Sequence, residues 1–163
     1  VPKEIVVGVA ISAPLSLKGS LEQLSLWNNW VYRTSFLFDL RKKYKLKMKQ
    51  FPELMSVSDY KKIKSLKTFD DIYTAPAHGF KDAFDYYEKN SSLQFLPEID
   101  IPVLILNAQN DSFLSQNCYP ISLAEKSKNI YLETPKHGGH VGFHKTDETY
   151  YSEERTLQFL TKK

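Results

Sequence analysis

The chain contains three short apolar runs, separated by longer stretches in which apolar and polar residues mix. Residues 5–11 are apolar throughout and largely β-branched, and residues 102–108 are apolar as far as Leu106. Continuous runs of this kind are typical of parallel strands that are covered on both faces. Residues 129–134 partly alternate between apolar and polar positions. The pattern therefore predicts three strands, the second of them central.

The region between the first two strands has the apolar spacing of helices. Ser20 and Gln23 are spaced as a capping box, which predicts a helix from about residue 20. A short helix is expected to begin at a cap formed by Ser58, and Pro76 is expected to break the helical pattern. Further helices are predicted at residues 81–90, at residues 121–128 and from a cap at Ser152 onward.

The predicted order is strand, helical insertion, strand, helix, strand, loop and helix. Such alternation indicates an α/β fold with a parallel sheet. The helical insertion occupies about residues 15–95, and residues 101–163 contain the loops after the second and third strands. Because ligands in these folds bind at the C-terminal ends of the strands, we expect the functional site in those loops.

The composition is typical of one globular domain. Of the 163 residues, 42% are hydrophobic and 25% are charged. The net charge of +3 is far from the bias of a dedicated nucleic-acid-binding protein, so no nucleic acid is expected as partner. The single cysteine, Cys118, cannot form an internal disulfide, which favours a reducing cytoplasm and a buried apolar role. The chain begins with Val1 rather than Met, directly before a predicted strand, and we expect it to be part of something longer.

Two residues with acid–base chemistry follow the second and third predicted strands. Asp111 closely follows the second strand, and His140 follows the third. Gly138 and Gly139 directly precede His140 and allow a tight turn. Adjacent parallel strands would bring the two loops together, so that Asp111 accepts the Nδ1 proton of His140 as in a hydrolase triad. Spacing alone leaves a second interpretation open, in which Asp111 caps a strand end and His140 is a surface residue.

Three motifs resemble those of the α/β-hydrolase superfamily and occur in the same order. Residues 107–113 resemble the acid loop of these enzymes, and residues 137–143 resemble their histidine loop. Residues 69–80, followed by 85–87, resemble the YheT-like branch, which also contains the mammalian abhydrolase lipid esterases. The likeness runs over nearly the whole chain and is weakest at residues 20–66. It identifies the chain as the C-terminal half of such a hydrolase.

The resemblance implies that Asp111 is the triad acid and His140 the general base of a serine hydrolase. The implied substrates are carboxylic esters of lipids or of short or medium acyl chains, and the triad needs no cofactor. The nucleophile of the family is a serine flanked by glycines on a strand-to-helix turn, and no G-x-S-x-G pattern occurs here. Ser12 ends a strand but lacks both glycines and a following helix, so we do not expect it to be the nucleophile. The chain alone is therefore expected to be inactive.

Other residues have both a structural and a functional interpretation. His137 and His140 have an H-x-x-H spacing that suits zinc, but the glycines between them argue against the helix that usually presents such a pair, so no metal is expected. His78 is expected to be structural. Residues 41–49 contain six basic residues, and we favour a solvated helix face over a surface for anionic lipid. The sequence does not decide whether an aromatic group lines an acyl-chain pocket or packs in the core; it comprises Trp27, Trp30, Phe36 and Phe38.

A second class of function is a non-catalytic α/β module that binds a partner through the edge of its sheet. The strand at residues 5–11 would have one unpaired edge, and unpaired edges invite pairing with another chain. We expect this edge to pair with a second copy or with the missing half of the hydrolase.

Overall fold

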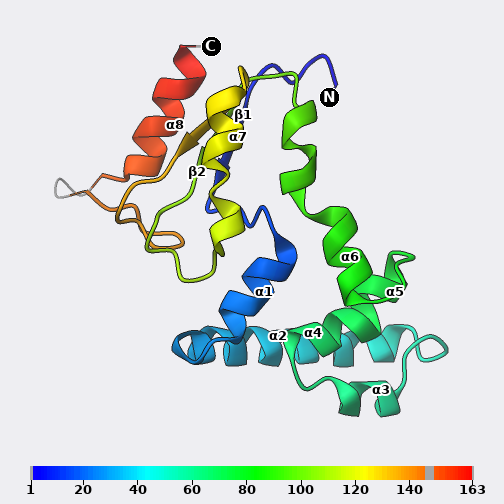
Figure 1. The fold of residues 1–163 in the computed structure, drawn as a ribbon. Coiled ribbons are helices and arrows are strands. Elements are labelled where there is room, and N and C mark those ends of the chain that lie inside the picture. Colours follow the sequence, from blue (N-terminus) through cyan, green and yellow to red (C-terminus); the bar gives the residue numbers. More distant parts are fainter. Residues whose placement is uncertain (1, 146–148, 163) are drawn as a thin grey trace. The chain divides into compact units, whose positions relative to one another are not determined.

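A computed structural model describes residues 2–145 and 149–162 and contains one sheet of parallel strands (Figure 1). The strands are β1 (Gly8–Ile11), β2 (Val103–Leu106) and β3 (Ile130–Glu133), in the order β1-β2-β3. Gly8 is paired with Val103, which in turn is paired with Ile130. The α/β fold with three parallel strands, predicted from the apolar runs, is confirmed.

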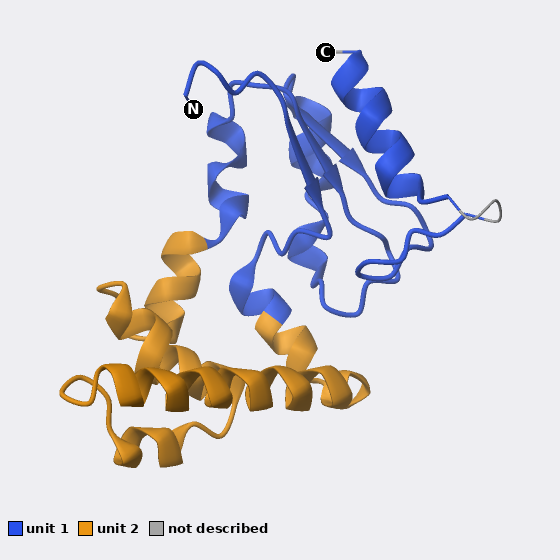
Figure 2. Ribbon diagram, turned by 180° about the vertical axis from the view of Figure 1, so that it is seen from behind, with its two compact units in different colours: residues 1–20, 91–163 blue, residues 21–90 orange. Residues whose placement is uncertain are grey.

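The chain folds into two compact units (Figure 2). The first unit contains residues 1–20 and 91–163 and includes the sheet, and the second contains residues 21–90 and is helical. The helical unit lies within the expected insertion at about residues 15–95. The helix α1 (Leu17–Ser25) carries the chain from the first unit into the second.

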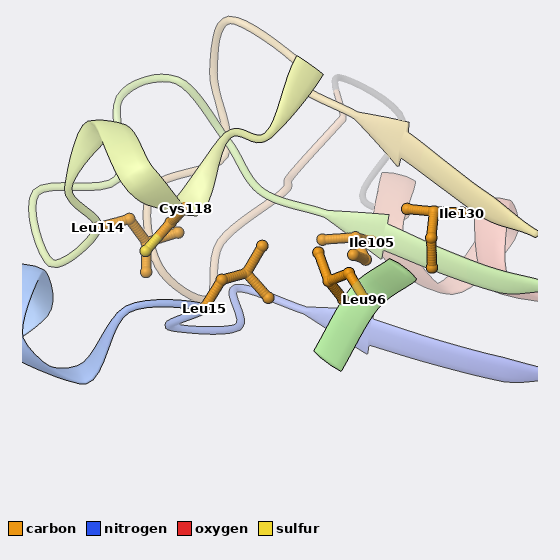
Figure 3. Packing of buried hydrophobic residues seen from close by; sticks show 6 residues of the cluster. All are labelled: Leu15, Leu96, Ile105, Leu114, Cys118 and Ile130. Atoms are coloured by element: carbon orange, nitrogen blue, oxygen red, sulfur yellow. The ribbon is translucent and has the colours of Figure 1, made fainter. Parts of the chain in front are cut away.

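One face of the sheet is covered by the segments on either side of β2. Ile105 and Ile130 lie on this face beside Leu96, and Leu15, Leu114 and Cys118 complete the buried cluster (Figure 3). Leu123 of the helix α7 packs against its rim. Three helical segments of the first unit border this face: η3 (Ser92–Glu98), η4 (Gln116–Cys118) and α7 (Ile121–Lys126).

The other face of the sheet is covered by the last helix, α8 (Tyr151–Thr161). The rings of Tyr131 and Phe159 meet edge to face with their centroids 5.2 Å apart. Arg155 of α8 forms a two-pronged ion pair with Glu133 at the end of β3, with Nε–O distances of 2.7 and 2.9 Å. Because both faces are covered, β2 is buried along almost its whole length, as its apolar run predicts.

The first strand is less buried than the sequence indicates. Within the described residues β1 pairs only with β2, and Ile11 at its end is 42% exposed. The continuous apolar run at residues 5–11 therefore contains more apolar surface than this chain covers.

The helical unit is built around the inner side of one long helix, α2 (Trp30–Gln50). Tyr44 of α2 is buried with Ile63 and Phe69, and its ring meets that of Tyr73 edge to face at 5.9 Å. Around it lie one 3₁₀ turn and five short helical segments: η1 (Trp27–Asn29), α3 (Val57–Lys62), α4 (Leu66–Phe69), the π-helical turn η2 (Asp70–Thr74), α5 (Ala75–Ala77) and α6 (Ala83–Asn90).

Three predicted helix starts are wrong by a few residues. The α1 helix begins at Leu17, because Ser16 Oγ accepts a hydrogen bond from the backbone N–H of Gly19 at 3.2 Å, ahead of the expected cap at residue 20. The cap of α3 is Ser56 rather than the expected Ser58. The hydroxyl of Ser56 accepts a hydrogen bond from the Asp59 N–H at 3.0 Å. The α8 helix has no side-chain cap, and the serine expected there, at 152, lies inside the helix.

Pro76 does not break the helical pattern. The preceding turn is π-helical, with the Ala75 N–H bonded to the carbonyl of Asp70, and this shift in hydrogen-bond register places the proline in the first turn of a new segment. The segment ends at Ala77, two residues before Gly79, which has a φ of +76°. Within the described residues, no helix is long and apolar enough to cross a membrane.

Candidate active site

Asp111 is held rigidly in the loop that follows β2. Its side chain is completely buried, and its Oδ1 accepts a hydrogen bond from the backbone N–H of Phe113 at 2.9 Å. Its own N–H donates to the carbonyl of Ala108 at 3.1 Å. These bonds leave the second carboxylate oxygen, Oδ2, for a partner on the neighbouring loop.

That partner is His140, in the loop after β3. The distance from His140 Nδ1 to Asp111 Oδ2 is 2.9 Å. An ionised carboxylate only accepts hydrogen bonds, so Nδ1 carries the proton, and in the neutral imidazole Nε2 then keeps its lone pair. The structure therefore brings together the two residues that the sequence analysis singled out, with the ring nitrogen Nε2 able to accept a proton.

The imidazole of His140 is packed on one side and open on another. The ring of Phe113 lies 4.6 Å from it, centroid to centroid, at an interplanar angle of 42°. The side chain of His140 remains 37% exposed. The ring is thus fixed in orientation by a carboxylate and an aromatic neighbour and is still accessible to a reacting group.

The histidine loop is shaped by backbone that only small residues permit. Gly139 has a φ of +57°, and a Cβ built on Gly138 would lie 2.7 Å from the ring of Phe143 and 2.8 Å from the Cβ of Ala108. Phe143 is buried, and its N–H donates to the carbonyl of Gly138 at 3.0 Å. The loop therefore folds tightly back onto the end of β2, and this holds His140 beside the acid.

Asn110 joins the two loops directly. Its Oδ1 accepts a hydrogen bond from the backbone N–H of Gly139 at 2.9 Å. From the sequence alone we assigned no role to Asn110 or to Phe143. Asn110 lies in the motif at 107–113 and Phe143 in the motif at 137–143. These motifs are the feature of the sequence that could have identified the two residues.

Tyr119 contacts the start of the acid loop, residues 107–113. Its hydroxyl donates to the carbonyl of Ala108 at 2.6 Å. Burial, together with the negative charge of Asp111 and a smaller effect of Cys118, raises the pKa of Tyr119 to about 12. The phenol therefore stays neutral and braces the end of β2.

The end of β1 is tied to the same edge of the sheet. Asn107 is fully buried, accepts from the Ala13 N–H at 2.9 Å and donates to the carbonyl of Cys118 at 2.9 Å. Ser12, which we did not expect to be a nucleophile, has a φ of +52° and is 7% exposed. Its hydroxyl is buried without a hydrogen-bond partner among residues 2–145 and 149–162.

The other residues considered from the sequence lie apart from this pair. His137 is exposed, and the ring of His144 lies against that of Tyr150 at 4.4 Å. His78 is exposed in the helical unit. Cys118 is buried, as predicted. In the part of the chain that the structure describes, no three His, Cys, Asp or Glu side chains gather in a way that could hold a metal ion.

Known proteins resemble this chain in sequence. YheT of Escherichia coli, named as an esterase, is 30% identical over 137 residues, which are 83% of this chain and 40% of YheT. The phospholipase ABHD3 of Mus musculus is 34% identical over 119 residues, 71% of this chain and 28% of that protein. The medium-chain fatty acid ethyl ester synthase/esterase 2 of Saccharomyces cerevisiae is 33% identical over 102 residues, 63% of this chain and 22% of that protein. No family model and no solved structure matches.

The parallel sheet and these relatives define the class of the protein: the chain belongs to the α/β-hydrolase superfamily. Within the superfamily it belongs to the YheT-like branch, and it matches the C-terminal half of those proteins. The chain spans 40% or less of the length of the three relatives above. One of these relatives is named as an esterase, one as a phospholipase and one as both a synthase and an esterase of fatty acid ethyl esters.

Proposed function

We propose that this chain supplies the acid and the general base of a Ser-His-Asp triad in a serine hydrolase that cleaves carboxylic esters. The observation that carries the proposal is the 2.9 Å contact between Asp111 Oδ2 and His140 Nδ1 at the C-terminal end of a parallel sheet. The names of the relatives support an ester of a lipid or of a short or medium acyl chain as substrate.

In this proposal His140 moves the protons and Asp111 stabilises the charge that results. Nε2 takes the proton of the attacking serine, and the imidazolium that forms lies beside the buried carboxylate of Asp111. The same proton then passes to the oxygen of the departing alcohol, and a water molecule repeats the cycle to release the acid. Because the carboxylate is buried and already hydrogen-bonded to Phe113, it is oriented before the charge develops.

The nucleophilic serine of the proposed triad comes from outside this chain. The sequence contains no G-x-S-x-G pattern, and Ser12, at the end of β1, is buried. The helical insertion at about residues 15–95 is then the cap of the hydrolase, and the 163-residue chain alone has no triad activity. A cytoplasmic location belongs to the same proposal, since the single cysteine is free.

The proposal is tested in the protein that contains this chain together with its serine. His140→Ala should lower the hydrolysis of a p-nitrophenyl acyl ester by about 10⁴- to 10⁶-fold, because it removes the base, and Asp111→Asn should lower it by about 10⁴-fold, because it removes the orientation of the base. His137→Ala is the matched control, since that residue is exposed in the same loop. It should change the rate by less than about threefold.

Two results would contradict the proposal. One is a His140→Ala protein that keeps its esterase rate and is folded by circular dichroism. The other is labelling of the 163-residue chain alone by a fluorophosphonate probe, which would show that the chain has its own activated serine.

A further inference from the structure

The helix α2 contains a concentration of positive charge. Seven of its residues are Lys or Arg and only Asp39 is acidic, so its net charge is +6, whereas the whole chain has +3. The rest of the chain is therefore net negative. The basic residues gather in the second half of α2, from Arg41 to Lys49. Charge of one sign on one element produces a local field that attracts anionic surfaces.

The first half of α2 and the turn before it expose large apolar side chains. Trp27 is 82% exposed, Phe38 is 68% exposed, and Trp30 and Val31 are each 54% exposed. The sequence left open whether the aromatic residues here pack in the core, and their exposure shows that they do not. Large apolar side chains that gather on a surface mark a place where another molecule or a membrane binds.

The apolar and basic residues share one side of α2. Val31 and Phe38 are seven residues apart, and both are exposed. Lys42 follows after four more residues and Lys49 after another seven, spacings that return to the same side of a helix, and both lysines are exposed. The residues of α2 that pack into the core of the helical unit lie on another side: Leu37, Leu40, Tyr44 and Met48.

We propose that this side of α2 docks onto an anionic lipid bilayer. Aromatic side chains such as Trp27 favour the boundary between headgroups and acyl chains. Lysines such as Lys42 and Lys49 are attracted to anionic headgroups, and each adds to the binding. The helix lies along the surface with its apolar end inserted and its basic end among the headgroups. The inference goes beyond ester hydrolysis and does not depend on it.

The segregation of the two kinds of residue distinguishes a lipid surface from nucleic acid. Binding of single strands relies on aromatic rings interleaved with cations along a groove. The exposed aromatic residues of α2 precede position 39, and the basic run begins at Arg41; the one aromatic residue inside that run, Tyr44, is buried. The sequence alone favoured a solvated helix face for residues 41–49, and the exposed apolar residues beside them change that interpretation.

The tryptophans of the chain report on the apolar end of α2. The sequence contains two, Trp27 and Trp30, and both are exposed at this end of α2. Vesicles of phosphatidylcholine and phosphatidylserine should shift their emission to the blue, and brominated phospholipids should quench it. Vesicles of phosphatidylcholine alone should do neither. The emission of a Trp27→Phe/Trp30→Phe variant, subtracted from that of the protein, isolates the signal in any longer form of the chain.

Matched variants separate the surface from the overall charge. Lys42→Glu/Lys49→Glu should weaken vesicle cosedimentation about tenfold or more, whereas Lys126→Glu/Lys128→Glu, the same change of charge at exposed lysines near α7, should alter it less than about twofold. Phe38→Ser should also weaken binding several-fold, and Leu157→Ser, a 65% exposed residue of α8, should not. Circular dichroism confirms that each variant is folded.

The proposal is overturned by any of three results. The folded protein fails to bind anionic vesicles, the two double-lysine variants lose binding equally, or duplex DNA binds as tightly as vesicles with no dependence on Phe38. None of these readouts uses esterase activity, so failure here leaves the triad proposal untouched, and an inactive His140→Ala protein should still bind vesicles.

Discussion

At the scale of single residues, the geometry of the site depends on positions where the backbone has little freedom. Gly138 has no room for a Cβ between Phe143 and Ala108, and Gly139 has a left-handed conformation. The hydrogen bond from Gly139 to Asn110 then fixes the loop beside Asp111. The sequence indicated the tight turn, but not which glycine is restricted by space and which by its φ angle.

We predict that Gly138→Ala destabilises the protein by about 1–3 kcal/mol, because the added methyl group overpacks a buried contact. Gly139→Ala is the control: the space around it is open, and its cost should be about 1 kcal/mol from the left-handed backbone. Urea unfolding of both variants measures the difference. Equal losses, or a larger loss for Gly139→Ala, would show that the Phe143 contact gives way.

Ser12 is a second restricted residue. A φ of +52° is unfavourable for a residue that carries a Cβ, and the buried hydroxyl of Ser12 makes no hydrogen bond within the described residues. Ser12→Gly removes both penalties and should raise the free energy of unfolding by about 1 kcal/mol. Ser12→Ala should gain less, because it keeps the strained φ. Chemical denaturation of both variants measures these free energies of unfolding. A loss of stability in Ser12→Gly would mean that the hydroxyl has a hydrogen-bond partner.

At the scale of elements, the ends of the strands are joined by side chains that cross between segments. Asn107 ties the end of β1 to η4, and Tyr119, which follows η4, donates to the end of β2. On the opposite face, Glu133 joins β3 to α8 through Arg155. These links keep the loops after β2 and β3 in place, since the strands have only four residues each.

The raised pKa of Tyr119 makes one of these links dependent on pH. Burial and the charge of Asp111 raise this pKa from 10.0 to about 12, so the folded state holds the proton more tightly than the unfolded state. The stability from Tyr119 is fully present below pH 10 and is lost as the pH rises from 10 to about 12. Tyr119→Phe should remove this part of the alkaline loss. Urea midpoints of the two proteins between pH 9 and about 12 measure it, and parallel curves would contradict it.

At the scale of the whole molecule, the sheet has an edge at β1. Gly8 and Ser12 donate their N–H groups to the β2 side, so by the alternation of a strand the N–H groups of Val9 and Ile11 face the other way. That edge faces no strand within the described residues, and Ile5, Val6 and Ile11 are exposed. The interpretation as a module that binds through its sheet edge rests on this feature.

We predict that the 163-residue chain pairs through this edge, either with a second copy or with the other half of the hydrolase. Sedimentation velocity of the chain alone should then show concentration-dependent association. Val9→Pro removes an outward N–H while leaving the β2 side intact, and should shift the chain toward monomer. A monomeric parent chain with a folded sheet would contradict the prediction.

The sequence by itself predicted the parallel α/β sheet, because short continuous apolar runs in a globular chain are typical of strands that are buried on both faces. It also indicated the superfamily, through ordered motifs at residues 107–113 and 137–143. The same motifs implied the pairing of Asp111 with His140, which the spacing alone left open. The helix starts at Leu17, Val57 and Tyr151 were missed because several nearby residues can cap a helix, and the sequence does not show which of them does.

Only the tertiary structure decided which side chains support the site and which apolar residues face outward. The exposure of Trp27 and Phe38 depends on which side of α2 meets Ile63 and Phe69, and helical spacing is compatible with more than one such side. The bond from Asn110 to Gly139 depends on two loops that are 29 residues apart in the chain. Such contacts arise from the packing of whole elements, and local sequence preference does not encode them.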